Sequence, residues 1–335
     1  MRVLVTGAAG FIGHHLARKL VERGDEVVGI DNLNDYYDVS LKQARLARFQ
    51  GVTGFTFERA DIADKAAMRR LFEARRYDGI VNLAAQAGVR YSLENPHAYV
   101  EANVVGFMNI LEGARHSGAG HLVFASTSSV YGLNTRLPLD EDQNTDHVVS
   151  LYAATKKANE VMAHSYAHLF GVPCTGLRFF TVYGPWGRPD MALFKFTRAI
   201  LAGQPITVFN NGHMIRDFTY IDDIVEGIVR VLDRPAARNA AWDPAAPEPS
   251  TSSAPWRIFN IGNNQRVELM DYIHAIEEGL GTKAKLEMLP MQPGDVMATE
   301  ADTRALQEHT GFKPKTLVKE GVMRFLQWYR EYYRV

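Results

Sequence analysis

The stretch that decides the fold is Met1–Asp31, which reads MRVLVTGAAGFIGHHLARKLVERGDEVVGID. Residues 2–5 form a short apolar run before a glycine-rich turn, a pattern typical of a buried strand. Apolar residues then recur at helical spacing from Ile12 to Val21, and residues 26–30 form a second apolar run. The order strand, glycine turn, helix and strand predicts one βαβ unit of a parallel sheet.

The turn holds three glycines, and each has a separate physical role. Gly7 permits a tight turn, Gly10 lets the backbone approach a pyrophosphate, and Gly13 lets the helix pack closely on the strand. The first helical residues, Phe11 and Ile12, would present free N–H groups to the phosphates. The spacing is Gly-x-x-Gly-x-x-Gly, a variant of the Gly-x-Gly-x-x-Gly dinucleotide motif.

A carboxylate ends the second predicted strand. Asp31 lies where it would accept a hydrogen bond from a ribose 2′-hydroxyl and repel a 2′-phosphate, so NAD is favoured over NADP. Asn32 begins the polar segment 32–38 at this strand end, where open α/β sheets bind ligands. Alternatively these are ordinary loop residues, but the strand before and the helix after the turn favour a nucleotide site.

Composition excludes several classes of protein. The chain has 335 residues, 46% of them hydrophobic and 22% charged, which is typical of a globular protein with a large α/β domain and a smaller one. A net charge of −1 gives no electrostatic reason to bind nucleic acid or an anionic membrane. The single cysteine, Cys174, excludes an intramolecular disulfide, and no secretory leader or bilayer-spanning apolar run is found. We therefore expect a cytoplasmic protein, and we predict no metal site.

The ends of the third and fourth predicted strands also point to the cofactor. The strand at residues 55–58 leads to Asp61 and Ile62. The Asp61 carboxylate either binds the adenine amino group or N-caps the next helix, and the sequence leaves both open. The strand at residues 79–83 leads to mostly small residues against which a cofactor can lie, beginning with Ala84, Ala85 and Gln86.

Two predicted helices contain polar residues of uncertain role. The helix at residues 39–50 has Arg45 and Arg48 on a basic face, which we expect to be solvated. The helix at residues 96–115 contains Asn103, which is either an ordinary hydrogen-bonding residue or one that orients active-site groups.

A hydroxyl cluster, Ser126–Ser129, ends the fifth predicted strand. Ser150 caps the next helix, on which Tyr152 and Lys156 share one face because they are four residues apart. A free phenol has a pKa of about 10, and a neighbouring ammonium and a bound nicotinamide cation would both favour its phenolate. A hydroxyl such as that of Thr127 would bond the same substrate oxygen. The pattern predicts a tyrosine base.

Together these motifs resemble the extended short-chain dehydrogenase/reductase superfamily, and within it the nucleotide-sugar 4-epimerases, over essentially the whole chain. The resemblance implies an α/β fold, with a doubly wound parallel-sheet (Rossmann) NAD-binding domain and a smaller α/β substrate domain. It assigns the family's hydroxyl, base and lysine to Thr127, Tyr152 and Lys156, and it implies a homodimer through the helices at 96–115 and 150–170. The predicted cofactor-binding residues are Gly7, Gly10, Phe11, Ile12, Gly13, Asp31, Asn32, Asp61, Ile62, Ala84, Ala85, Gln86, Tyr152 and Lys156.

We predict two domains from this resemblance. Residues 1–180 with 217–260 would form the NAD-binding domain, and residues 181–216 with 261–335 the nucleotide-sugar-binding domain. Residues 234–257 are rich in Pro, Ala and Ser, which indicates a surface insertion.

The residues after the Ser-Thr pair distinguish this chain from related enzymes. The family's dehydratases have an acidic pair there, and its UDP-glucuronate decarboxylases have a glutamate before Val-Tyr-Gly. Ser128 and Ser129 stand at these positions and cannot supply a carboxylate, so both reactions are disfavoured. The segments 151–159 and 188–191 are instead most similar to those of the UDP-glucuronate 4-epimerases.

Further residues complete the predicted substrate site. Arg188 is expected to bind the sugar carboxylate, because a guanidinium matches a carboxylate bidentately, although by spacing it could equally cap a loop or pair with Asp190. Arg90 is a second candidate. By resemblance, the remaining substrate-binding residues are Ser128, Thr181, Arg216 as the diphosphate arginine, and Asp295 in a loop over the nucleotide, where Gln292 replaces a phosphate-binding arginine of the galactose epimerases.

The sequence therefore predicts NAD-dependent 4-epimerisation of a UDP-sugar, with UDP-glucuronate favoured. Hydride would leave C4, the 4-keto sugar would rotate, and hydride would return to its other face. The alternatives are a UDP-glucose/UDP-galactose 4-epimerase, a reductase that releases NADH, and a non-catalytic NAD-binding regulator.

Overall fold

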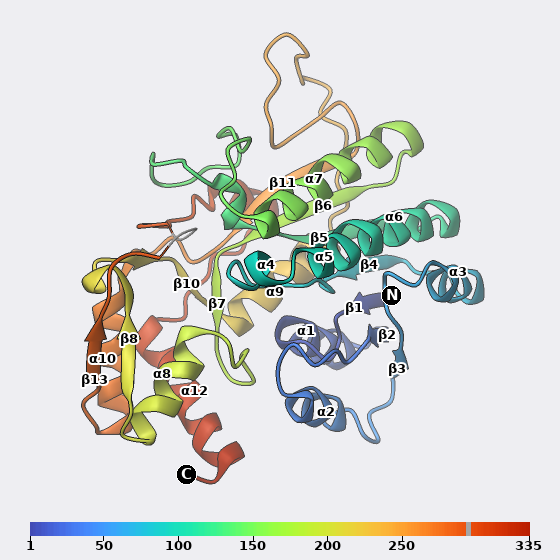
Figure 1. The fold of residues 1–335 in the computed structure, drawn as a ribbon. Coiled ribbons are helices and arrows are strands. Elements are labelled where there is room, and N and C mark those ends of the chain that lie inside the picture. The colour runs from blue at the N-terminus through green and yellow to red at the C-terminus, as the bar shows by residue number, and fades with distance from the viewer. Residues whose placement is uncertain (293–295) are drawn as a thin grey trace.

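A seven-stranded sheet forms the centre of the computed structural model, which describes residues 1–292 and 296–335 (Figure 1). All of its neighbouring strands pair in parallel. In spatial order they are β3 (Phe55–Arg59), β2 (Glu26–Asp31), β1 (Arg2–Thr6), β4 (Gly79–Asn82), β5 (His121–Thr127), β6 (Cys174–Phe179) and β11 (Trp256–Ile261). The strand order reverses at β1, and at such a switch point open α/β sheets bind ligands. The predicted doubly wound fold is confirmed.

Helices cover both faces of this sheet, and each face has its own core. On one side α1 (Phe11–Glu22) packs on α9 (Ile221–Leu232), and on the other α6 (Gly106–Ser117) lies between α3 (Lys65–Ala74) and α7 (Leu151–Phe170). Strand β1 supplies both cores because successive side chains point to opposite faces. Val3 and Val5 join the core of α1 and α9, whereas Leu4 joins that of α6.

A smaller group of elements lies to one side of the sheet (Figure 1). It contains short strand pairs and packed helices, and its core is rich in aromatic residues from α12. Its elements are β7 (Thr181–Tyr183), α8 (Ala192–Leu201), β8 (Pro205–Val208), β9 (Ile215–Arg216), β10 (Phe218–Tyr220), β12 (Val267–Glu268), α10 (Leu269–Leu280), β13 (Lys285–Met288) and α12 (Val318–Tyr333). Helix α11 (Arg304–Thr310) packs instead on β11 and α9. The predicted domain boundaries stay a prediction.

The helix expected at residues 96–115 is interrupted. A short α4 (Tyr91–Glu94) and α5 (Pro96–Tyr99) precede a π-helical turn over Val100–Val105, after which α6 begins. Asn103 lies buried inside this turn, and π-turns of this kind recur at functional sites.

The prediction of a solvated basic face on α2 (Val39–Ala47) is wrong. Arg45 is fully buried, because its guanidinium donates to the carbonyl of Ala9 and to those of Trp186 and Gly187. Helical periodicity correctly placed Arg45 on one face of α2. Its burial depends on loops distant in sequence, which the periodicity does not reveal.

The predicted insertion at residues 234–257 connects α9 to β11 without a helix of its own, and its last two residues, Trp256 and Arg257, already belong to β11. Within the described residues, every helix is too short or too polar to span a lipid bilayer.

Candidate functional site

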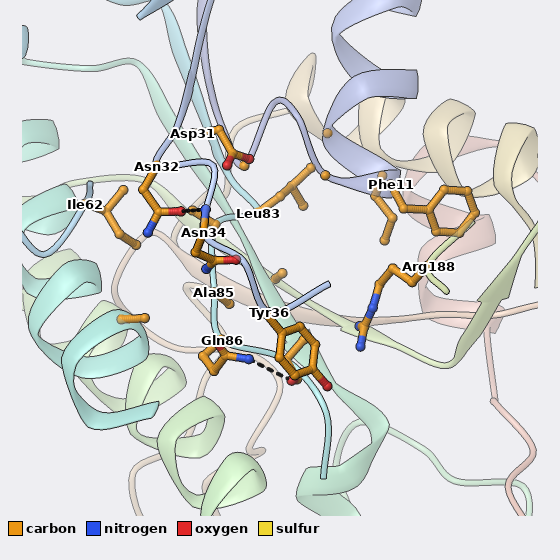
Figure 2. Close-up of a pocket in the computed structure, with 18 of the residues that line it drawn as sticks. Phe11, Asp31, Asn32, Asn34, Tyr36, Ile62, Leu83, Ala85, Gln86 and Arg188 are labelled. Atoms are coloured by element: carbon orange, nitrogen blue, oxygen red, sulfur yellow. Dashed lines mark hydrogen bonds between the residues drawn. The ribbon is translucent and has the colours of Figure 1, made fainter. Parts of the chain in front are cut away.

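One pocket opens at the carboxyl ends of the central strands (Figure 2). The glycine turn after β1, the ends of β2 to β5, the start of α7 and the loop after β7 all contribute to its wall. All fourteen predicted cofactor-binding residues line it, and so do Thr127 and Arg188. The fold thus brings these residues together from widely separated parts of the chain.

The glycine turn leaves no room for side chains. Gly7 has a positive φ of 72°, and a Cβ placed on it would lie 2.9 Å from the backbone nitrogen of Ala84. A Cβ on Gly13 would lie 2.1 Å from the Gly7 carbonyl oxygen. Helix α1 begins at Phe11, directly after this turn, so its N-terminus points into the pocket as a pyrophosphate requires. The turn therefore fits a dinucleotide.

Polar groups from β2 and β3 line the far end of the pocket. The buried Asp31 carboxylate accepts hydrogen bonds from Ala9 N at 3.2 Å and Leu33 N at 2.8 Å. Asn32 donates to the Asp61 carboxylate at 2.9 Å. The N-cap interpretation of Asp61 is wrong, because Asp64 caps α3 instead.

Asn103 fixes the segment that follows β4. Its amide oxygen accepts from Gln86 N at 2.8 Å, and its amide nitrogen donates to the Gln86 carbonyl and to the Thr155 hydroxyl, both at 3.0 Å. Asn159 in turn donates to the Asn103 carbonyl at 2.6 Å. The π-turn therefore ties the pocket wall to α7, on which Tyr152 lies.

Tyr152, Lys156 and Thr127 all line this pocket. Burial raises the pKa of Tyr152, whereas its hydrogen bond to Thr127 and the charge of Arg188 both act to lower it. Burial also lowers the pKa of Lys156 to about 8, and its ammonium donates to the Ala125 carbonyl at 2.9 Å. The charge that lowers the pKa of Tyr152 here is that of Arg188, and the predicted effect of Lys156 on the phenol stays a prediction.

Arg188 extends into the same pocket (Figure 2). Its guanidinium pairs with the Asp190 carboxylate through both Nε and Nη2, as its spacing allowed. Tyr36 donates to the same carboxylate at 3.2 Å. Arg188 is therefore paired with Asp190 inside the protein, and its charge also acts on Tyr152.

The other predicted substrate residues lie apart from this pocket. Ser128, Thr181 and Arg216 line a neighbouring cavity. Arg90 lies outside both cavities, with its guanidinium 4.7 Å from the ring centroid of Phe209. Asp295 lies outside the described residues.

Sequence reasoning missed several polar residues of the pocket, among them Asn34, Tyr36 and Lys42. The first two belong to the polar segment after β2, whose position at a strand end was the available signal. The Lys42 ammonium donates to the Asn34 carbonyl and amide oxygens, both at 2.8 Å. Its place on α2 gave no sign that it would turn inward.

Known proteins share this architecture. Residues 3–244 match the NAD dependent epimerase/dehydratase family. The chain is 52% identical over 338 residues to the probable UDP-glucuronate 4-epimerase of Rhizobium meliloti (strain 1021), with 100% of this chain and 98% of that one covered. It is 48% identical to UDP-glucuronate 4-epimerase 3 of Arabidopsis thaliana, with 99% of this chain and 77% of that one covered. The crystal structure of the Bacillus cereus UDP-glucuronic acid 4-epimerase in complex with UDP-glucuronic acid and NAD aligns with a TM-score of 0.88 at 31% identity, over 99% of this chain and 100% of that one.

Proposed function

Because this chain belongs to the NAD dependent epimerase/dehydratase family, we propose that it is a UDP-glucuronate 4-epimerase that uses bound NAD. It interconverts UDP-glucuronate and UDP-galacturonate. The observation that supports this most directly is the position of Thr127, Tyr152 and Arg188 in one pocket with the glycine turn.

The reaction begins at the sugar 4-hydroxyl. The pocket residues would hold NAD, which when bound would supply the hydride acceptor for C4 and the hydride donor for the return step, so the reaction has no net oxidation. Tyr152 accepts the hydroxyl proton as the C4–H bond breaks, and it returns a proton when the rotated 4-keto sugar is reduced. Thr127 lies beside the phenol and would hydrogen-bond the same substrate oxygen, which holds that oxygen near Tyr152.

The phenol needs help to act as a base at neutral pH. Burial keeps its pKa above the ordinary value, although the hydrogen bond to Thr127 and the charge of Arg188 lower it in part, so a bound nicotinamide cation would have to lower it further. Lys156 adds a second cation, an ammonium, to the pocket and holds the end of β5 through its hydrogen bond to the Ala125 carbonyl.

Arg188 gives the site its preference for a sugar acid. Its guanidinium lies in the pocket with Tyr152, where it can bind the C6 carboxylate of the hexuronate. Ser128 and Ser129 offer hydroxyls and no carboxylate, so they do not supply the acid/base group that decarboxylation or dehydration would use.

We also propose a cytoplasmic homodimer with the two predicted domains. The apolar side chains that α6 and α7 expose support this assembly, among them Met108, Val161 and Leu169. Light scattering of the purified chain would give twice the monomer mass, and Val161→Glu would lower that value.

Proton NMR of purified protein with UDP-glucuronate and no added cofactor tests the proposed function. The anomeric signal of UDP-galacturonate should appear, which would also show that NAD stays bound. Conversion of UDP-glucose alone would replace this proposal with a galactose epimerase, and a pentose product would show decarboxylation.

A further inference from the structure

The loop after β7 contains an arginine whose charge is already balanced inside the protein. Arg188 and Asp190 are two residues apart, and the carboxylate takes the Nε and Nη2 edge of the guanidinium. Both side chains are largely shielded, with relative exposures of 23% and 24%. Burial alone would raise the pKa of Asp190, but the charge of Arg188 holds it below the usual value. The pair is therefore ionised and neutral overall.

A residue from a distant segment holds this pair. Tyr36, which follows β2, donates its hydroxyl to Asp190 Oδ2 at 3.2 Å. Burial and the charge of Asp190 raise the pKa of Tyr36 to about 12, so the hydroxyl keeps its proton and donates at neutral pH. The ring packs on Tyr91 with centroids 4.9 Å apart. Figure 2 shows Tyr36 and Arg188 extending into the same part of the pocket.

The backbone leaves a space for the Tyr36 hydroxyl. Gly88 has a positive φ of 101°, and a Cβ placed on it would lie 2.7 Å from that hydroxyl oxygen. The hydroxyl is thus enclosed between Gly88 and Asp190. Because Tyr36 also lines the cofactor pocket, this contact links the segment at the end of β2 to the arginine beside Tyr152.

Charge balance at this point has a consequence for substrate selection. A buried arginine without a counter-ion would bind any carboxylate very tightly, because desolvated opposite charges attract strongly. Asp190 repels a second carboxylate and competes for the same guanidinium. The hydrogen bond from Tyr36 withdraws part of the negative charge of Asp190. Asp190 then competes less strongly with the sugar carboxylate for the Arg188 guanidinium.

We propose that Asp190, tuned by Tyr36, is a specificity-determining residue that limits how tightly Arg188 holds the sugar carboxylate. This inference rests on the proposed function, since it concerns the substrate of that same site. The 4-keto sugar must rotate between the two hydride transfers, and an anchor that is too strong would slow this rotation. The internal carboxylate lets the site recognise an acid and still release it.

Two substitutions test the proposal because they should act in opposite directions. Asp190→Asn keeps the shape and removes the charge, so the dissociation constant for UDP-glucuronate should fall about tenfold. Tyr36→Phe returns charge to Asp190, so the same constant should rise about threefold. Neither should change the dissociation constant for UDP-glucose, which lacks the carboxylate. Titration calorimetry in a Tyr152→Phe background measures both ligands without conversion.

Turnover gives a second readout. With Tyr152 intact, Asp190→Asn should lower kcat for UDP-glucuronate about fivefold while KM also falls, because tight ground-state binding opposes the rotation. A residue that merely supports the loop would raise KM for both sugars alike. The bound NAD per chain is measured in every variant, so that cofactor loss through Tyr36 is recognised.

A matched control removes the same kind of contact elsewhere. Tyr166 donates to the Glu112 carboxylate at 2.6 Å, between α7 and α6, and Tyr166→Phe should leave the ratio of the two dissociation constants unchanged. Equal shifts for both sugars, or weaker UDP-glucuronate binding by Asp190→Asn, would overturn the proposal. If the unaltered enzyme fails to convert UDP-glucuronate, the proposed function itself is wrong, which is a separate result.

Discussion

The glycine turn at residues 7–13 is packed backbone against backbone, whereas the loop at residues 184–191 places the side chain of Arg188 in the pocket. The turn is shaped by contacts within itself and with the next strand end, such as the approach of Gly13 to the Gly7 carbonyl. The loop is held by side chains from far along the chain, including Tyr36 and Arg45. A cofactor site can thus be encoded locally, while the substrate site beside it depends on long-range packing.

Two side chains connect the glycine turn and the loop at residues 184–191, which form two walls of the pocket. Arg45 donates to Ala9 O in the glycine turn at 2.9 Å and to Trp186 O in the loop at 2.7 Å. His15, on the helix after the turn, donates from Nε2 to Pro185 O at 3.0 Å. If the walls are two parts of one site, breaking these links should affect both cofactor and sugar.

The largest effect should come from Tyr152, which lies between the walls. Tyr152→Phe should lower kcat about a thousandfold, because the proton of the 4-hydroxyl then has no acceptor. Binding of UDP-glucuronate and the melting temperature should stay near those of the unaltered enzyme. NMR conversion rates and calorimetry measure these, with Tyr166→Phe as the control. Residual activity above one tenth would show that another group is the base.

The next largest effect should come from a substitution in the glycine turn, the wall that is formed by residues close together in the chain. In Gly13→Ala the added methyl would lie 2.1 Å from the Gly7 carbonyl oxygen. We expect the free energy of unfolding to fall by about 3 kcal/mol and purified protein to lose NAD. Urea unfolding and cofactor content measure this. Gly24→Ala adds a methyl at a positive φ with open space around it, so it should cost only about 1 kcal/mol and retain NAD.

Removing the link between the walls should have a slightly smaller effect. Arg45→Met keeps an apolar stem but leaves the carbonyls of Ala9, Trp186 and Gly187 without their donor. The free energy of unfolding should fall by about 2 kcal/mol, and both NAD retention and UDP-glucuronate affinity should weaken. The exposed Arg69→Met serves as control and should change stability by about 0.5 kcal/mol or less. Loss of NAD alone would show that the walls act separately.

The last effect is absent at neutral pH and appears only in acid. Burial lowers the pKa of His15 to about 4, and its hydrogen bond to Pro185 opposes this only in part. Between pH 6.5 and 4 the unfolded chain therefore binds a proton that the folded chain does not, so stability falls as pH falls through this window. His15→Gln should remove about 2 kcal/mol of that acid sensitivity. Urea unfolding at pH 7 and pH 4.5 gives the comparison, and an unchanged pH dependence would contradict it.

Local patterns predicted most of the fold. The glycine turn and the alternating strands and helices of the first half follow from periodicity and turn chemistry, and a parallel doubly wound sheet was predicted from them. The edge strand β11 was not, since its first two residues fall in the predicted insertion. The interruption at Val100–Val105 was not predicted, because the helical pattern continues through it. Its stability comes from the bonds of Asn103 to Gln86 and Thr155, which lie far away in sequence.

The residues of the candidate site also fall into two groups, those that the sequence could predict and those that it could not. Residues at strand ends were predictable, since parallel strands bring their carboxyl ends to one edge. Tyr36 and Lys42 were missed, because a polar loop and a basic helix face look the same whether solvated or folded inward. For Asp61, the sequence offered two roles, and the capping of α3 by Asp64 removed one of them.

The sequence by itself determined the βαβ unit, the preference for NAD and the candidate tyrosine base, because each depends on residues close together in the chain. Only the tertiary structure decided that Arg188 pairs with Asp190 under the hydroxyl of Tyr36, and that Arg45 is buried between the two walls. The physical reason is that the cost of burying a charge depends on its partners, and these partners come from loops that meet only when the sheet has formed.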